Sequence, residues 1–152
     1  MDRASEYAAV RAQLASLLED RPGFLAGMAT ACALLKEAFD HVLWVGFYLP
    51  AGDGSLAVGP YQGPVASLRL PPGKGVCGAA AASRTTVLVP DVHAFPGHIA
   101  CDPRSKSEIV VPVLAGDTLR AVLDVDSHEP RAFDDRDREG LEEIARLLAP
   151  LP

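Results

Sequence analysis

Apolar residues recur at helical spacing near both ends of the chain. Between residues 4 and 19 they repeat every three or four positions, which predicts a helix with one buried face. The stripe resumes after a Pro-Gly break, so a second helix is expected over 24–39. A third helix is expected over 135–148, where Asp134 is a suitable N-cap and acidic residues fill the first turn.

The middle of the chain carries strand patterns instead. Residues 42–49 are rich in aromatic and β-branched side chains, as strands require. Gly-containing turns at 51–54 and 115–117 predict two hairpins. We expect further strands over 55–61, 85–89, 108–114 and 119–126, a weaker strand over 65–70, and a short Ala-rich helix over 76–83. Helices at both ends of a largely antiparallel sheet make the predicted fold class α+β.

Composition narrows the class of protein. The chain has 152 residues, 49% hydrophobic and 22% charged, which suits one domain, 1–152, with its own core. The net charge of -6 and the lack of a basic cluster argue against a nucleic-acid partner. No apolar run approaches the roughly 20 residues of a membrane helix, and no signal-peptide pattern opens the chain. We therefore expect a cytoplasmic protein without a membrane partner, whose thiols stay reduced.

Two strands place unusual side chains on one face. Because side chains alternate along a strand, Trp44, Gly46 and Tyr48 share a face in the first strand. Gly46 between two large aromatic residues leaves a gap that would suit the floor of a small-ligand site. The alternative is that the two aromatic side chains simply pack under a helix.

Asp124 and Asp126 likewise share one face of the last strand, and the opposite face is apolar. A solvated sheet face would explain them. However, the strand is short, apolar and expected to be central, and buried acids without partners are unfavourable. Such a pair could bind an ammonium group, or one acid with a raised pKa could donate a proton.

The cysteines are the remaining candidates for chemistry. Cys101 lies in the Gly/Pro-bounded stretch Gly97-His98-Ile99-Ala100-Cys101-Asp102, with Glu108 just downstream, and such polar neighbours can tune a thiolate. Cys77 lies between two glycines, whereas Cys32 falls on the apolar stripe of the second helix and is expected to be structural. The spacing of Cys77 and Cys101 is not that of a C-x-x-C motif. We therefore predict no metal site and no cofactor, although His93 and His98 keep a zinc site conceivable. A redox pair fits two such cysteines better, since an odd count of three disfavours a static disulfide framework.

Several motifs, taken in order, resemble the free methionine-(R)-sulfoxide reductases, which are single GAF-domain enzymes. The resemblance covers nearly the whole chain, from about Ala8 to Leu148, and the ordered set of motifs is far more specific than any one of them. They are Trp44-Val45-Gly46-Phe47-Tyr48, Gly59-Pro60-Tyr61-Gln62-Gly63, Gly73-Lys74-Gly75-Val76-Cys77-Gly78, Asp91-Val92-His93, Phe95-Pro96-Gly97-His98-Ile99-Ala100-Cys101-Asp102, Ser107-Glu108-Ile109-Val110-Val111-Pro112 and Val122-Leu123-Asp124-Val125-Asp126-Ser127.

The resemblance implies a fold, an activity and roles. It implies a GAF-like fold and reduction of free L-methionine-(R)-sulfoxide, recycled by thioredoxin or a similar dithiol, in what is expected to be a homodimer. Cys101 matches the catalytic cysteine and Cys77 a resolving cysteine. The other matched positions are the substrate-pocket acids Glu108, Asp124 and Asp126 and the aromatic residues Trp44 and Tyr48 around the substrate methyl group.

The chain departs from the family pattern at one position. Ser67 stands where family members typically carry a third redox cysteine, and a serine cannot resolve a sulfenic acid. Recycling must then use Cys77 or an external thiol. Two other readings stay open: a GAF module that senses a small ligand without catalysis, and a sensor in which Cys101 responds to peroxide.

Overall fold

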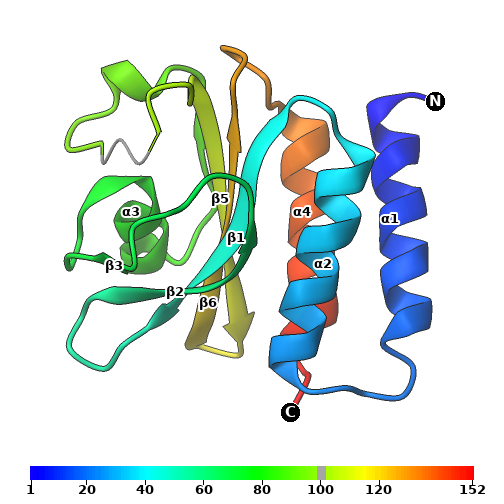
Figure 1. Ribbon diagram of the computed structural model, residues 1–152. Helices are drawn as coiled ribbons and strands as arrows, with labels where there is room; N and C mark the ends of the chain where they lie inside the picture. Colours follow the sequence, from blue (N-terminus) through cyan, green and yellow to red (C-terminus); the bar gives the residue numbers. More distant parts are fainter. Residues whose placement is uncertain (99–101) are drawn as a thin grey trace.

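One antiparallel sheet divides the molecule into two layers. The computed structural model describes residues 1–98 and 102–152. In this part of the chain the sheet has six strands in the order β3-β2-β1-β6-β5-β4, and every neighbouring pair is antiparallel (Figure 1). The strands are β1 (Val42–Pro50), β2 (Leu56–Gln62), β3 (Arg69–Leu70), β4 (Val87–Val89), β5 (Ser107–Ala115) and β6 (Thr118–Ser127).

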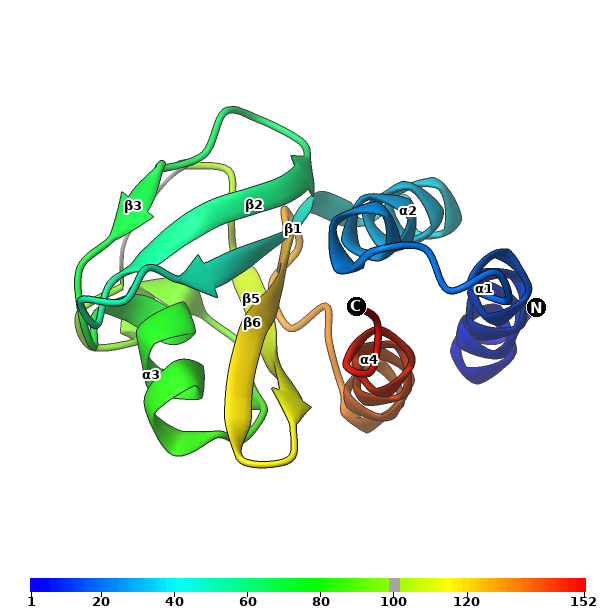
Figure 2. The same cartoon turned by 90° about the horizontal axis from the view of Figure 1, so that it is seen from below.

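The helices are divided unequally between the two faces of the sheet. The helices are α1 (Arg3–Leu17), α2 (Phe24–Ala38), α3 (Gly75–Ser83) and α4 (Asp135–Leu148), with a short 3-10 turn at Val92–Ala94. Figure 2 shows α2 and α4 against one face, with α1 outside them, and α3 alone on the other. The α+β class, the antiparallel sheet and the flanking terminal helices are therefore confirmed.

Most of the predicted elements also occur where the sequence patterns placed them. Both predicted hairpins are present, β1–β2 and β5–β6. The expected strand over 65–70 is the exception, since only Arg69 and Leu70 pair with β2. Val65 and Leu68 are both exposed, so the apolar pattern there does not reflect a buried strand face. None of the described helices is both long and apolar enough to span a bilayer.

Alternation along the central strands creates two separate cores. On β1, Val45 and Phe47 face the three terminal helices, and on β6 Ala121, Leu123 and Val125 do the same. The alternate residues of β1, Trp44 and Tyr48, belong to the second core under α3. This second core is smaller, and polar side chains interrupt it.

A buried carboxylate joins the first helix to the last. Asp137, in the first turn of α4, is fully buried and accepts hydrogen bonds from Arg3 Nη1 at 2.8 Å and Tyr7 Oη at 2.9 Å. It also accepts from the backbone N–H of Asp134 and so completes a capping box at the start of α4. Both carboxylate oxygens are therefore satisfied, as a buried charge requires.

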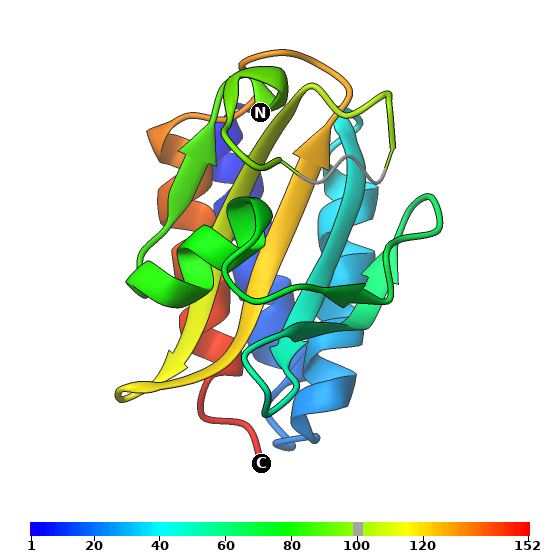
Figure 3. The same ribbon diagram turned by 90° about the vertical axis from the view of Figure 1, so that its left-hand side faces the viewer.

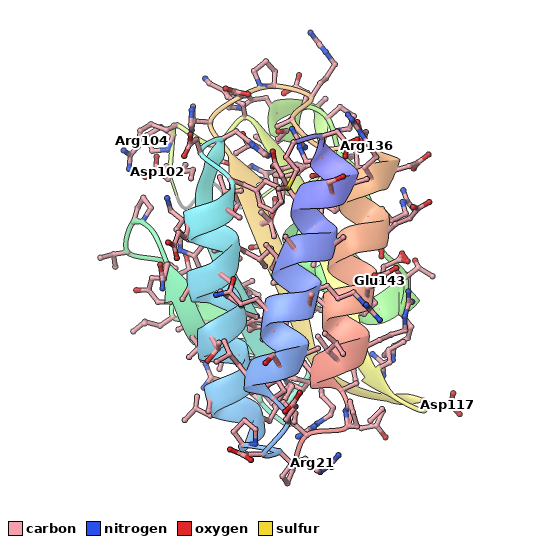
Figure 4. All side chains as sticks on the ribbon, turned by 90° about the vertical axis from the view of Figure 1, so that its right-hand side faces the viewer. Arg21, Asp102, Arg104, Asp117, Arg136 and Glu143 are labelled. Atoms are coloured by element: carbon pink, nitrogen blue, oxygen red, sulfur yellow. The ribbon has the colours of Figure 1, made fainter. Side chains whose placement is uncertain are left out.

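Removing this carboxylate should loosen α1 from α4. We expect Asp137→Ala to lower the free energy of unfolding by about 3 kcal/mol, because Tyr7 and Arg3 lose their partner and α4 loses its cap. Urea denaturation followed by circular dichroism measures this loss. The control is Glu143→Ala, which breaks a half-exposed ion pair with Arg11 on the outer face of α4 and should cost less than about 1 kcal/mol (Figure 4). Equal losses in the two variants would contradict the prediction.

Candidate active site

A cavity lies in the second layer, between the sheet and the segments that cover it. Figure 3 shows α3, and the chain that leads from β3 to it, passing in front of the strands on this face. The cavity has about 620 Å³ of empty space, part of it open to solvent. Its walls come from β1, β5, β6, α3 and the connections before β3 and β5. Trp44, Tyr48, Cys77, Glu108, Asp124 and Asp126 all line it, so the fold brings these sequence-predicted residues together.

The strand register explains how residues so far apart in sequence meet. In the pairing of β1 with β6, Trp44 is opposite Asp126, and in the pairing of β6 with β5, Asp126 is opposite Glu108. Asp124 lies two residues along β6, on the same face. Directly opposite side chains have Cβ atoms roughly 5 Å apart, and like charges at such positions repel. The register therefore concentrates carboxyl groups where the sheet alone would disfavour them.

Burial raises the pKa of two of these acids. Glu108 and Asp124 are 6% and 5% exposed. Desolvation raises the pKa of Glu108 well above its ordinary value, and the negative charge of Asp126 raises it further. Desolvation likewise raises the pKa of Asp124, with a further contribution from Glu108. Both carboxyl groups can therefore donate a proton or a hydrogen bond near neutral pH. The alternative of a solvated face is wrong for Asp124.

Cys77 lies on α3 and not in a loop. It is 4% exposed, and its Sγ lies within 4.8 Å of carboxylate oxygens of both Glu108 and Asp124. Desolvation raises the pKa of this thiol well above its ordinary value, and the neighbouring carboxyl groups of Asp124, Glu108 and Asp126 raise it further. In this arrangement Cys77 is a protonated thiol and a weak nucleophile.

His98 and Asp102 lie on either side of the segment that carries Cys101. His98 Nε2 is 3.7 Å from Glu108 Oε1. Burial lowers the pKa of His98 and raises that of Glu108, so the two groups meet in their neutral forms rather than as an ion pair. Asp102 accepts two hydrogen bonds from the Arg104 guanidinium, at 3.0 and 2.8 Å, and these side chains lie together in Figure 4. This pairing, together with the Arg104 backbone N–H, lowers the pKa of Asp102 to about 2, so Asp102 is not a proton donor at neutral pH.

Aromatic rings form the apolar wall of the cavity. The Trp44 ring is stacked between those of Tyr48 and Tyr61, with centroids 5.8 and 5.2 Å away. The Tyr48 hydroxyl donates to the backbone oxygen of Ser67 at 3.2 Å, which fixes the ring. The predicted gap at Gly46 is wrong, because Tyr61 and the Trp44 ring fill the space in which a Cβ would lie. Gly46 allows this close packing and does not itself line the cavity.

The predictions for Cys101 and Cys32 and the zinc alternative fare differently in the structure. Cys101 lies outside the residues that the structure describes, so its proposed role stays a prediction. Cys32 is 1% exposed in the core between the helices and the sheet, where burial raises its pKa to about 12, and its structural role is confirmed. Among the described residues, the group of possible metal ligands consists of Cys77, Glu108 and Asp124 and includes neither His93 nor His98. The conceivable zinc site with Cys101 falls outside the described residues.

Two wall residues were not singled out from the sequence. Ser105 is buried, and its Oγ has no hydrogen-bond partner among the described residues. Lys74, the residue before α3, is exposed and adds a cation to a lining whose other charged residues are acidic. Lys74 occurs within the Gly73-Lys74-Gly75 motif, which could have indicated it. No sequence signal pointed to Ser105.

Comparison with known proteins identifies the family. The family model described as GAF domain matches residues 24–151. Free methionine-R-sulfoxide reductase from Escherichia coli (strain K12) is 40% identical over 148 residues, which cover 97% of this chain and 89% of that protein. The free methionine-R-sulfoxide reductase from Saccharomyces cerevisiae is 40% identical over 140 residues, covering 87% of this chain and 77% of its own.

Solved structures agree in fold as well as in sequence. The free methionine-R-sulfoxide reductase from Neisseria meningitidis, in complex with its substrate, superposes with a TM-score of 0.93 at 44% identity, covering 98% of this chain and 89% of its own. The reduced form of the Staphylococcus aureus protein gives a TM-score of 0.89 at 46% identity, covering 94% and 92%. With this level of identity over nearly the whole length of each protein, the chain belongs to the GAF-domain family of free methionine-R-sulfoxide reductases.

Proposed function

We propose that this protein reduces free L-methionine-(R)-sulfoxide to L-methionine. The observation that carries the proposal is the row of acids Glu108, Asp126 and Asp124 beside an aromatic wall, in a cavity that opens to solvent. The relatives from Escherichia coli, Saccharomyces cerevisiae and Neisseria meningitidis are all named for free methionine-R-sulfoxide, and they supply the substrate class. In this proposal the whole chain acts as one GAF domain that carries its own chemistry.

The acids explain why a free amino acid would be preferred to a methionine within a peptide. A free methionine sulfoxide carries an α-ammonium group that a peptide-bound residue lacks. Asp126 is more exposed than Glu108 and Asp124, and its charge contributes to the raised pKa of Glu108, so we assign it the ammonium group. A peptide-bound methionine sulfoxide cannot form this ion pair, so it would bind more weakly by several kcal/mol, on the order of a lost charged hydrogen bond.

The first chemical step transfers oxygen from substrate to enzyme. The Cys101 thiolate attacks the sulfoxide sulfur, while a neutral carboxyl group, Glu108 or Asp124, protonates the sulfoxide oxygen. The S–O bond of the substrate breaks and the oxygen passes to the Cys101 sulfur. Methionine sulfur is thereby reduced by two electrons, and Cys101 is oxidised to a sulfenic acid. Trp44 and Tyr48 would hold the methyl group of the substrate against the apolar wall.

The second step forms a disulfide, and a reductant then returns both cysteines to thiols. The Cys77 sulfur attacks the sulfenic acid, water leaves, and a Cys77–Cys101 disulfide forms. A dithiol of the thioredoxin type, oxidised to its own disulfide, returns both cysteines to thiols. Ser67 at the position of the third family cysteine leaves Cys77 as the resolving residue. A cytoplasmic location and a homodimer, both expected from the sequence, stay predictions.

Replacing Cys101 should abolish turnover. Cys101→Ser removes the thiolate, so we expect the rate to fall by at least about 1,000-fold. Thioredoxin-coupled NADPH consumption measures it with free methionine-(R)-sulfoxide, and the S epimer tests stereospecificity. Cys32→Ser is the control and should keep the wild-type rate, because its hydroxyl can still donate to the Pro60 backbone oxygen. A wild-type protein without turnover would favour a ligand sensor, and oxidation by peroxide without discrimination of the epimers would favour a peroxide sensor.

Replacing Cys77 should stop the cycle after one turnover. In Cys77→Ser the sulfenic acid forms on Cys101 but has no resolving thiol. We therefore expect a burst of about one methionine per protein, followed by a stall when thioredoxin is the only reductant. Rapid quenching and quantification of methionine measure the burst. Continued turnover at the wild-type rate would show that an external thiol does the resolving.

Replacing Asp124 should raise stability and lower activity. Asp124 binds a proton in the folded state at pH values where the unfolded chain has lost it, because burial raises its pKa. The wild-type protein therefore loses stability as the pH rises above about 4, the unfolded pKa, toward the raised folded pKa. Asp124→Asn should thus unfold with a free energy higher by about 1 kcal/mol or more at pH 8, and the gain should shrink toward pH 4.

Turnover should meanwhile fall by about 100-fold, because an amide cannot supply a proton. Denaturant titrations at several pH values and the coupled assay measure the two effects on one preparation. The same stability difference at pH 4 and pH 8 would argue that Asp124 is ionised in the folded protein.

A further inference from the structure

Three potential metal ligands converge in the cavity from three separate elements. Cys77 on α3, Glu108 on β5 and Asp124 on β6 each offer one atom, and these three atoms lie within 4.8 Å of one another. Ligand atoms around a tetrahedral zinc ion are about 3.3–3.7 Å apart, given Zn–S of about 2.3 Å and Zn–O of about 2.0–2.2 Å. A shift of roughly 1 Å in these side chains would therefore bring all three into coordination.

Two buried polar atoms in this cavity have no hydrogen-bond partner among the described residues. Asp124 Oδ1 is buried and has no hydrogen-bond partner in residues 1–98 and 102–152. Ser105 Oγ, which lies in the same cavity, is also buried and also lacks a hydrogen-bond partner among these residues. Buried polar atoms in folded proteins are otherwise nearly always paired, so these two indicate space for a polar or charged guest.

The donor set favours a particular class of ion. A thiolate with two carboxylate oxygens suits zinc and its close relatives, whereas calcium and magnesium require six or more oxygen ligands or several waters. Two acids and a thiol held neutral by burial would become three anionic ligands once a dication compensated their charge.

We propose that the reduced protein binds one zinc-class divalent ion through Cys77, Glu108 and Asp124. The ion would bind the resolving thiol and the two acids that face the substrate. Metal binding and sulfoxide binding would therefore exclude each other. This second statement rests on the proposed function, whereas the metal site itself does not. The protein would then be inhibited by free zinc when its cysteines are reduced.

Cobalt(II) is a suitable probe because a thiolate ligand gives it a charge-transfer absorption band in the near ultraviolet. We expect reduced wild-type protein to develop this band with one equivalent of cobalt and to lose it when zinc is added. Cys77→Ser should abolish the band, and Asp124→Asn should weaken binding by at least about 10-fold. Cys32→Ser is the matched control and should leave the band unchanged. Circular dichroism of each variant verifies its fold.

Two further arms decide between the alternatives. Cys101→Ser should keep the band; loss of the band in this variant, with retention in Cys77→Ser, would overturn the assignment of the thiolate ligand. Absence of stoichiometric binding to the wild-type protein would overturn the site.

Free methionine-(R)-sulfoxide should raise the apparent dissociation constant for cobalt in proportion to its concentration. If cobalt binds and the sulfoxide does not compete, the exclusion is wrong while the metal site stands. An inactive protein that still binds cobalt would refute the proposed function alone.

Discussion

The pairing of β1, β6 and β5 in one register is the constraint on which the site depends. Because Trp44, Asp126 and Glu108 stand opposite one another across these strands, an aromatic wall and an acidic floor meet without any loop having to position them. A shift by one residue in either pairing would turn the acids toward the terminal helices, where the core is apolar. The large core beneath α1, α2 and α4 therefore fixes the chemistry on the opposite face.

The small core under α3 contains the carboxyl groups whose burial is unfavourable. It packs apolar residues such as Val110 and Val122 next to carboxyl groups that burial deprives of solvent. Perturbed acids and a protonated thiol in one cavity are typical of functional sites, which sacrifice local stability for reactivity. Asp137, on the other side of the sheet, illustrates the contrast, because a buried acid with a structural role has every oxygen satisfied.

Much of this organisation could be predicted from the sequence. Periodicity located the helices and the long strands, and alternation on β1 and β6 correctly separated Trp44 and Tyr48 from Val45 and Phe47. Alternation alone could not show what fills a space, so Gly46 was taken for a gap that Tyr61 occupies. Likewise the convergence of Cys77 with Glu108 and Asp124 has no spacing signature, because it arises from elements that meet only in the tertiary fold. The short segment before β3 was misjudged because two of its apolar residues, Val65 and Leu68, are exposed.

The position of β1 in the sheet has a consequence for how the protein folds. β1 pairs with β2 through a local hairpin, but its other neighbour, β6, comes from the far end of the chain, with Val42 opposite Ser127. Closing so long a stretch of chain costs conformational entropy before the contacts between β1 and β6 can stabilise the fold. Non-local contacts of this kind therefore slow folding. The two hairpins can form independently, yet neither holds a complete row of site residues. The cavity thus comes into existence only with the last long-range pairing, so a partly folded chain has hairpins and helices but no site.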